Sequence, residues 1–264
     1  MTHDEKRRFL IRKLLAEMPQ YGSGALPESA GEQRLLLRSL MNLRPPRPID
    51  SDFLNIQDEY LREELSARHV VAGEALPPSP VDPRLVLWRG DITALKVDAI
   101  VNAANSALRG CYIPCHACVD NVIHSASGIQ LRLACDRLMQ AQGHEEPAGR
   151  AKITPAYNLP SRFVIHTVGP IVSGPLTQAH CAQLAACYRS CLMLAVSHGL
   201  KSIAFCCIST GEFHFPQRQA AEIAVDTASA FLRTDDRLQS VIFDVFKQED
   251  HDIYKELLGY GTEK

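Results

Sequence analysis

The sequence predicts an α/β protein: a three-layer α/β/α sandwich with a mixed central sheet, preceded by an N-terminal helical extension. Two observations lead to this fold class. From about Arg84 onward, short apolar segments alternate with longer segments whose apolar residues recur at helical spacing. The short segments are apolar throughout rather than at every second position, which is typical of strands in a sheet that is covered on both faces.

The first 80 residues are expected to be helical, because they contain no convincing strand. Helices are predicted around residues 9–15, over 31–42 and from 52 to 68. Asp50 or Ser51 can cap the third helix by accepting a hydrogen bond from a free backbone N–H. Four prolines in segment 75–83 forbid regular structure there and indicate a linker. We therefore divide the chain into a helical region, 1–80, and an α/β domain, 81–264.

The α/β domain is predicted to contain strands that alternate with helices. The strands are expected over 85–92, 97–105, 151–159, 162–168, 202–209 and 240–246. The helices are expected over 116–140, 176–199, 215–233 and 250–259. In such sheets ligands bind outside the carboxyl ends of the strands. Three of these ends carry small or polar residues, at 90–92, 102–105 and 209–215.

Composition and charge disfavour several classes of partner. The net charge is -2, with 28 basic against 30 acidic residues, so a generic nucleic-acid binder is disfavoured. No segment approaches the ~18 apolar residues of a membrane span, and the N-terminus lacks the apolar core of a secretory signal. The nine cysteines are an odd number set among periodic apolar segments, which favours reduced thiols. We expect a cytoplasmic protein, and a monomer.

One short segment carries metal-ligand chemistry. In residues 110–118, Cys111, His116 and Cys118 offer two thiolates and an imidazole, a set that favours Zn²⁺. Three protein ligands leave a tetrahedral site one position short, which a catalytic zinc needs for water or a substrate hydroxyl. Two other interpretations stay open: Cys115 as a fourth ligand that closes a structural site, or thiols that hold no metal. We favour a bystander role for Cys115.

The other candidate positions suit a nucleotide, and each also has a purely structural explanation. Loop 209–216 joins a strand to a helix, so its amides suit a diphosphate, although Ser, Thr and Gly are also common in turns. Asp91 suits an exocyclic amine or a capped turn, and Asn102 and Asn105 suit ribose hydroxyls or turns. Asp120, in the first turn of a helix, suits a water or a ribose hydroxyl, or simply the helix dipole. His124 is expected to be buried.

These residues together resemble the macrodomain family, the ADP-ribose-binding fold. The matching motifs are G-D-I-T (90–93), V-D-A-I-V-N-A-A-N (97–105), V-D-N-V-I-H (119–124), V-I-H-T-V-G-P (164–170) and I-S-T-G-E-F-H-F-P (208–216). In place of the family's glycine run stands G-C-Y-I-P-C-H-A-C (110–118), which resembles the zinc-dependent branch of microbial protein-ADP-ribose hydrolases. Segments 36–49 and 53–65 also fit that branch, so the resemblance covers nearly the whole chain.

The resemblance implies a role for each matched position. Cys111, His116 and Cys118 would bind zinc, and Asp120 would lie beside the distal ribose and act with them in catalysis. Asp91 would bond adenine, with the backbone of Ile92, and Asn105 would hold the distal ribose. Phe246 would contact the adenosine end. The full set of implied ADP-ribose-binding positions is Asp91, Ile92, Asn105, Val119, Asp120, Ser209, Thr210, Gly211, Glu212, Phe213 and His214. Glu212 departs from the expected small or apolar residue, so its carboxylate is predicted to face solvent or a cation.

The resulting hypothesis is a zinc-dependent hydrolase that removes mono-ADP-ribose from a modified protein side chain. Zinc would polarise the distal ribose end or activate a water, with Asp120 as the group that orients this water. An acidic side-chain ester is the first guess for the linkage. A non-catalytic reader of ADP-ribose and an O-acetyl-ADP-ribose deacetylase are the alternatives. The N-terminal helices are expected to brace the sheet or to help recognise the modified protein.

Overall fold

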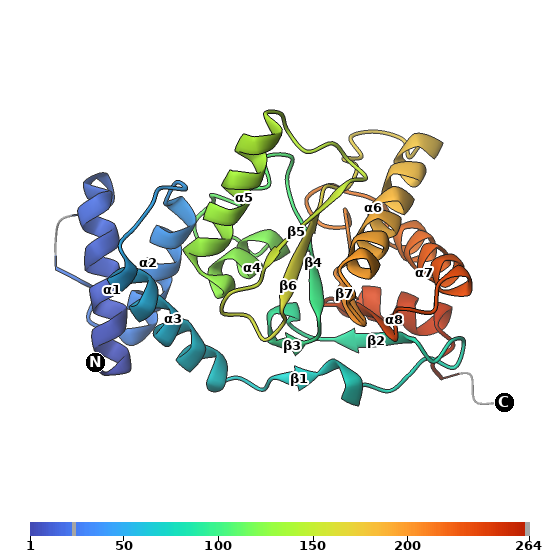
Figure 1. Cartoon of the computed structure of the whole chain (residues 1–264), viewed down its shortest axis with the longest axis horizontal. Helices are drawn as coiled ribbons and strands as arrows, with labels where there is room; N and C mark the ends of the chain where they lie inside the picture. Colours follow the sequence, from blue (N-terminus) through green and yellow to red (C-terminus); the bar gives the residue numbers. More distant parts are fainter. Residues whose placement is uncertain (23–24, 262–264) are drawn as a thin grey trace.

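The computed structural model describes residues 1–22 and 25–261 and confirms the α/β prediction. A six-stranded mixed sheet lies at the centre of the molecule (Figure 1), in the order β2-β8-β7-β4-β6-β5. Only β5 runs antiparallel to its neighbour in this sheet. The strands are β2 (Leu85–Arg89), β4 (Ala99–Ala103), β5 (Ala151–Pro155), β6 (Phe163–Thr167), β7 (Ser202–Phe205) and β8 (Ser240–Val245). A small parallel pair, β1 (Val71–Ala72) and β3 (Leu95–Lys96), is separate from the sheet.

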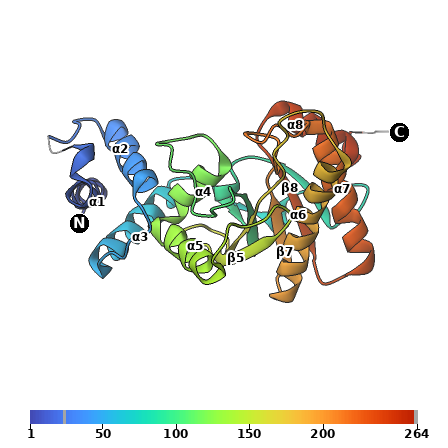
Figure 2. The same ribbon diagram turned by 90° about the horizontal axis from the view of Figure 1, so that it is seen from above.

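Helices cover both faces of the sheet, as expected from its continuous apolar strands. On one face lie α4 (Val119–Ser127) and α5 (Ile129–Gln142), and on the other α6 (Gln178–Ser197), α7 (Gln217–Thr234) and α8 (Gln248–Leu257). Figure 2 shows the two groups of helices on opposite sides of the strands. The alternation of side chains fixes this arrangement: Asn102 of β4 contacts α4, whereas Phe205 of β7 packs on Tyr188 of α6, with ring centroids 4.9 Å apart.

The N-terminal helices are α1 (His3–Glu17), α2 (Ala30–Leu43) and α3 (Ser51–Ser66). Each begins at a capping residue, and Asp50 caps α3 as expected, by accepting a hydrogen bond from the Phe53 N–H at 2.7 Å. These helices share an apolar cluster that also takes in Ile129 of α5, so the helical region packs directly on the domain. Short 3₁₀ helices follow at η1 (Pro19–Tyr21), η2 (Gly73–Ala75) and η3 (Ile92–Ala94).

The prediction of one long helix over 116–140 is wrong, because Gly128 separates α4 from α5. Gly128 has φ +98°, a conformation that side chains with a Cβ rarely adopt. Gln57 of α3 occupies the place of the missing side chain, where a Cβ would lie 2.6 Å from its Nε2. The same Gln57 accepts a hydrogen bond from the Ile129 N–H at 3.0 Å, so it satisfies the start of α5. The break thus leaves room for the side chain of Gln57 at the start of α5.

Several predicted strands are shorter than expected. The fifth one ends at Phe205 rather than at 209, and the first at Arg89 rather than at 92. Their last predicted residues belong instead to the segments that follow these strands, and Ile92 begins the 3₁₀ helix η3. Val71 and Ala72, in a region expected to have no strand, pair with Leu95 and Lys96.

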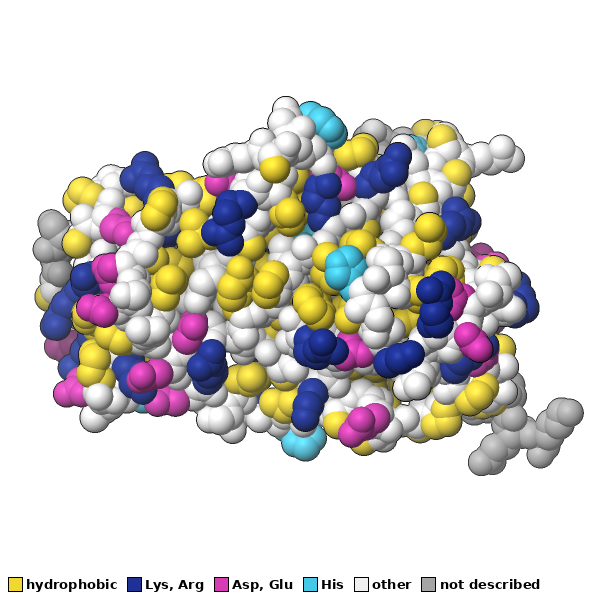
Figure 3. Space-filling view, in the orientation of Figure 1, with side chains coloured by type: hydrophobic (Ala, Val, Ile, Leu, Met, Phe, Trp, Pro, Cys, Tyr) yellow, Lys and Arg dark blue, Asp and Glu magenta, His cyan; other side chains and the backbone are white. Residues whose placement is uncertain are grey.

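The surface shows no sign of a membrane segment among the described residues: none of their helices combines the length and the apolar character needed for a span. Figure 3 shows side chains of both charges interspersed, most densely over the N-terminal helices, with no extended basic area on this face.

The packing of α2 yields a first prediction. Leu40 is 1% exposed in the apolar cluster, whereas Leu35 on the same helix is 58% exposed. Leu40→Ala is expected to lower the free energy of unfolding by about 2–5 kcal/mol through lost burial and a residual cavity, and Leu35→Ala by less than about 0.5 kcal/mol. Urea denaturation of both variants measures this. Equal effects of the two substitutions would contradict the packing described.

Candidate functional site

The polar loops that follow the parallel strands meet at one edge of the sheet. Strands β2, β4, β6, β7 and β8 are parallel, so their carboxyl ends all face the same way. The loops after β2, β4 and β7 carry Asp91, Asn105 and Ser209 respectively. Three predicted segments, far apart in the sequence, are thereby brought together.

Cys111, His116 and Cys118 form the metal-ligand cluster that their spacing predicts. Their ligand atoms, the two sulfurs and an imidazole nitrogen, all lie within 4.8 Å of one another, and all three residues are half-buried. Ligands about 2.3 Å from a tetrahedral Zn²⁺ would stand about 3.8 Å apart. The cluster therefore fits one zinc ion after small shifts of the side chains.

Cys115 lies outside this cluster. Its backbone has φ +52°, the left-handed region, which turns its side chain away from its neighbours'. The thiol lies 3.2 Å from the hydroxyl of Ser39 and donates to the backbone carbonyl of Leu35 at 3.4 Å, both on α2. The described residues thus offer three ligands rather than four, and the interpretation as a site closed by Cys115 loses its support.

Electrostatics keep Cys118 of the cluster protonated in the absence of a cation. Burial and the neighbouring thiol of Cys111 raise the pKa of Cys118 to about 12. A thiol in this setting stays protonated unless a positive charge stabilises the thiolate. A bound metal ion supplies that charge directly, so the pair of close thiols and the imidazole form a coherent donor set for zinc.

Asp120 lies in the first turn of α4, beside the cluster, and is 5% exposed. Its Oδ1 accepts a hydrogen bond from Asn102 Nδ2 at 2.7 Å and lies 3.5 Å from Nε2 of His124. Burial raises the pKa of Asp120 to about 6. Among the described residues, its Oδ2 has no hydrogen-bond partner. One oxygen is thus fixed and the other is available to a ligand.

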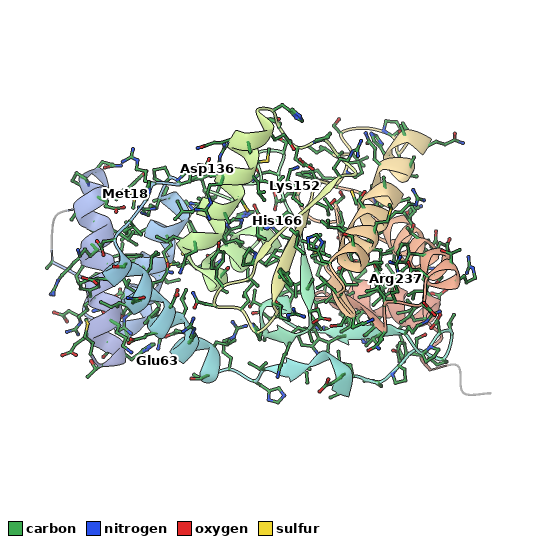
Figure 4. All side chains as sticks on the ribbon, viewed as in Figure 1. Met18, Glu63, Asp136, Lys152, His166 and Arg237 are labelled. Atoms are coloured by element: carbon green, nitrogen blue, oxygen red, sulfur yellow. The ribbon has the colours of Figure 1, made fainter. Side chains whose placement is uncertain are left out.

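A second group of potential ligands, His124, Cys135 and His166, lies wholly in the interior. Figure 4 labels His166 on β6, within the molecule rather than at its surface. Its Nδ1 lies 3.2 Å from Asn102 Nδ2, and its Nε2 lies 2.9 Å from Thr154 Oγ1. Both ring nitrogens of His166 are therefore engaged, and His166 supports Asn102 and, through it, Asp120, whereas the ring nitrogens of His124 have no hydrogen-bond partner among the described residues. Asn102 itself is fully buried and donates to Asp120, which disfavours a contact with ribose hydroxyls, one of the two roles weighed for it.

Gly110 lets residues 109–118, which we call the metal loop, approach this network. It has φ +79°, and a Cβ there would lie 2.8 Å from the ring of His124. His124 is 5% exposed, as expected, and burial lowers its pKa. Only a residue without a side chain fits between the loop and the ring.

Asp91 is engaged in two ways. Its Oδ1 accepts from the N–H and the hydroxyl of Thr93, at 2.9 and 2.6 Å, and so caps η3, the structural alternative for this residue. Its Oδ2 accepts a hydrogen bond from the guanidinium of Arg68, which follows α3. An adenine amine would have to share this carboxylate with Arg68. Ile92 begins η3 and is 3% exposed.

Asn105 also stabilises its own loop. Its Oδ1 accepts from the Ala107 N–H at 3.1 Å, and its Nδ2 donates to the Gly110 carbonyl at 3.3 Å. The side chain therefore links the end of β4 to the start of the metal loop, the turn-forming role weighed above. Val119, the first residue of α4, is half-buried between this loop and the core.

The loop after β7 presents free backbone amides. Among the described residues, the N–H groups of Gly211, Glu212 and Phe213 donate to no protein acceptor. Bonds at either end shape the loop: Phe215 donates to the Ser209 carbonyl at 2.9 Å, and His214 to that of Gly211 at 3.1 Å. Left-handed backbone occurs at Ser209 and His214 rather than at Gly211. Three consecutive free donors, with Thr210 before them, suit a diphosphate.

Glu212 lies as predicted, with its side chain 70% exposed and its Oε1 3.7 Å from Nε2 of His116. The carboxylate thus faces a metal-ligand residue instead of the loop amides. Phe246 follows β8 and is 77% exposed at the same edge of the sheet.

The residues whose hydrogen bonds position the site residues were not identified from the sequence. His166 was readable in principle, because a histidine inside an apolar strand must find polar partners when it is buried. Three arginines gave no signal in the local sequence pattern, because the tertiary fold alone brings them to the site. They are Arg38, Arg68 and Arg132, which donate hydrogen bonds to His116, Asp91 and Cys111 respectively.

A mixed sheet covered by helices on both faces, with free loop amides at the carboxyl ends of its strands, matches the macro domain fold. The Macro domain family matches residues 101–224. Over 263 residues the chain is 53% identical to a protein-ADP-ribose hydrolase of Treponema medium, covering 98% of this chain and 100% of that protein. It is 43% identical to the protein-ADP-ribose hydrolase of Staphylococcus aureus strain MSSA476, covering 99% and 98%.

Solved structures agree. The Trypanosoma brucei macrodomain in complex with ADP-ribose superposes with a TM-score of 0.66 at 31% identity, covering 88% of this chain and 97% of that one. The Oceanobacillus iheyensis macrodomain with ADP gives a TM-score of 0.60 at 39% identity, covering 67% and 90%. The chain belongs to the macro domain family, and its full-length relatives carry the name protein-ADP-ribose hydrolase.

The buried network yields a pH prediction. Burial lowers the pKa of His166 to about 3, whereas a histidine of the unfolded chain titrates near 6.5. The folded state therefore binds one proton fewer between these values, and the free energy of unfolding falls as pH drops below about 6.5. Replacing His166 with Gln is expected to remove about 1.4 kcal/mol per pH unit of this slope between about pH 4 and 5.5.

Urea denaturation over this pH range measures the slope, with His198→Gln as the control for replacing an exposed histidine. Parallel pH profiles for wild type and the His166→Gln variant would show that the ring is not buried in its neutral form.

Proposed function

We propose that this protein is a zinc-dependent hydrolase that removes mono-ADP-ribose from modified protein side chains. The observation that carries the proposal is the cluster of Cys111, His116 and Cys118 beside the buried carboxylate of Asp120. Full-length relatives named protein-ADP-ribose hydrolase support the hydrolase activity. The donor set supports zinc.

The three ligand residues would hold the metal beside the N-terminal end of α4 and leave one coordination position open for a ligand. When bound, zinc supplies a Lewis acid for a ribose hydroxyl or a water molecule. Because two of the ligands are thiolates, a reducing compartment such as the cytoplasm suits the site.

Asp120 is proposed as the general base. Burial raises the pKa of Asp120 to about 6 in the metal-free protein, and a nearby zinc would lower it, so the carboxylate is ionised at neutral pH and can accept a proton from water. Asn102 holds Oδ1, which leaves Oδ2 to accept a hydrogen bond from water. As this water attacks the anomeric carbon of the distal ribose, Asp120 takes its proton. The bond between that carbon and the side-chain oxygen breaks, and the protein's carboxylate leaves.

The remaining loops would position the nucleotide. The free amides of Gly211, Glu212 and Phe213 would bond the diphosphate, which explains anion binding by a chain of net charge -2. Asp91 and the backbone of Ile92 would contact adenine, and Asn105 the distal ribose. Bound in this way, the anomeric carbon would lie on the side of the metal loop and Asp120.

Two substitutions test the proposal together. Cys118→Ala is expected to abolish zinc binding, and Asp120→Asn to keep zinc but lower kcat on an ADP-ribosylated protein by about 100-fold or more, the usual contribution of a general base. Cys115→Ser is the control, because this thiol contacts α2 instead of the cluster. Metal analysis and single-turnover hydrolysis give the two readouts.

The alternatives predict different results. If wild-type protein bound ADP-ribose but hydrolysed no modified protein, the chain would be a reader. If it released acetate from O-acetyl-ADP-ribose much faster than it released ADP-ribose from protein, it would be a deacetylase. Full zinc content and full activity in the Cys118→Ala variant would refute the metal assignment.

A further inference from the structure

The metal loop, residues 109–118, has no helix or strand to hold its backbone. Within the loop, the only described backbone hydrogen bond joins the His116 N–H to the Ile113 carbonyl at 3.3 Å. Side chains from outside the loop bind several of its other backbone groups. Three of these side chains, described below, belong to α2 or reach α2, so the helical extension contacts the proposed metal centre directly.

Arg38 of α2 makes the central contact. Its Nη2 donates to the His116 carbonyl and to Asn121 Oδ1, both at 2.8 Å. Asn121, fully buried on α4, in turn donates from Nδ2 to the Ile113 carbonyl at 2.9 Å. Because Arg38 binds the oxygen of this amide, it fixes which way the amide points. Arg38 thus holds the His116 carbonyl directly and the Ile113 carbonyl through Asn121.

Asn42 holds the loop at its strained residue. The side chain is 1% exposed and accepts a hydrogen bond from the Cys115 N–H at 2.9 Å. Its Nδ2 donates to the hydroxyl of Ser125 on α4 at 3.0 Å, which fixes the orientation of this amide too. The bond stabilises the left-handed backbone of Cys115, which costs free energy without such support.

Arg132 of α5 joins the beginning of the loop to the end of α2. It is 4% exposed and donates to the carbonyls of Arg109, at 2.6 Å, and Cys111, at 3.2 Å. It also donates to the carbonyls of Asn42 and Arg44, at 2.6 and 2.7 Å. These last two belong to the C-terminal turn of α2, whose carbonyls lack partners within the helix.

These contacts use the loop's backbone and leave the ligand side chains free. Among the described residues, neither thiol of the cluster bonds to α2. The backbone is therefore held in a shape in which Cys111, His116 and Cys118 already converge.

We propose that Arg38 and Asn42 of the N-terminal helical region are positioning residues of the metal centre, which order the metal loop before the ion binds. This inference rests on the proposed function, because it takes zinc as the occupant of the cluster. Groups that orient metal ligands commonly contribute 10-fold to 100-fold to affinity. The helical extension then sets how tightly the metal is held.

The test compares Arg38→Ala with Arg34→Ala in the full-length protein. Arg34 lies one turn earlier on α2, but its guanidinium pairs with Glu64 of α3, so it is a matched control. Competition with a chromophoric chelator measures the zinc dissociation constant, which we expect to rise about 10-fold to 100-fold in Arg38→Ala and to stay within about twofold in Arg34→Ala. The Co²⁺-substituted variant should show an altered visible spectrum, while the thermal midpoint of the metal-free protein stays close to that of the control.

Hydrogen exchange of the Cys115 amide gives an independent readout in wild type, should the variant fail to fold. The inference requires this amide to be protected in the metal-free protein, because Asn42 already holds it. Rapid exchange without zinc would overturn it, as would unchanged zinc affinity in a folded Arg38→Ala variant. If wild type itself bound no zinc, the metal assignment of the proposed function would fail first, and this inference with it; zinc binding by wild type with no effect of Arg38→Ala would defeat this inference alone.

Discussion

The buried guanidinium of Arg132 is the constraint on which the geometry of the site depends. It joins three parts of the chain whose proximity the sequence does not reveal: the C-terminal end of α2, the start of the metal loop, and α5 on the face of the sheet. A buried cation is costly unless its donors are satisfied, and here backbone carbonyls from two segments satisfy it. Neither segment can move without leaving Arg132 unpaired. The stacking of Tyr112 on the guanidinium, 4.1 Å from its ring centroid, closes the arrangement on the solvent side.

Two kinds of polar group thus meet at this edge, and they differ in whether other protein groups bond to them. Behind the site, Asn102, His166 and Thr154 are joined by hydrogen bonds; burial keeps the imidazole neutral, and Asn102 donates to Asp120 while its own Oδ1 has no partner among the described residues. In front, the thiols, the free amides and Oδ2 of Asp120 have polar atoms that no protein group satisfies. Rigid support beneath unsatisfied groups is the arrangement expected of a preorganised site.

Much of the fold was predictable, because its signals are local. Continuous apolar runs located the six strands of the sheet, and Pro45, Asp50 and Gly199 marked the ends of helices correctly. The convergence of Cys111, His116 and Cys118 was predictable for the same reason, since they lie within eight residues. The helix break at Gly128 was missed because a single glycine is tolerated inside a helical pattern, and Gln57 that exploits it lies 72 positions from Ile129.

The side chains that hold the metal loop were not predictable, because their contacts join residues that lie far apart in the sequence. Arg38 reaches His116 across 78 positions of sequence, and Asn42 reaches Cys115 across 73. On α2 alone these residues look like ordinary polar positions of an amphipathic helix. Likewise, sequence alone allowed Asn102 to be a ribose ligand or a turn residue. The alternation of side chains along β4 places it in the interior instead.

The central claim is that one metal ion bound by Cys111, His116 and Cys118 lies against the distal ribose of bound ADP-ribose. Anomalous X-ray diffraction at the zinc absorption edge, from crystals of the purified protein with ADP-ribose, tests it most directly. The account predicts a single strong anomalous peak among the three side chains, with a ribose oxygen or a water as the fourth ligand and Asp120 beside it. A loop without such a peak, or a metal enclosed by four protein ligands away from the sugar, would contradict it.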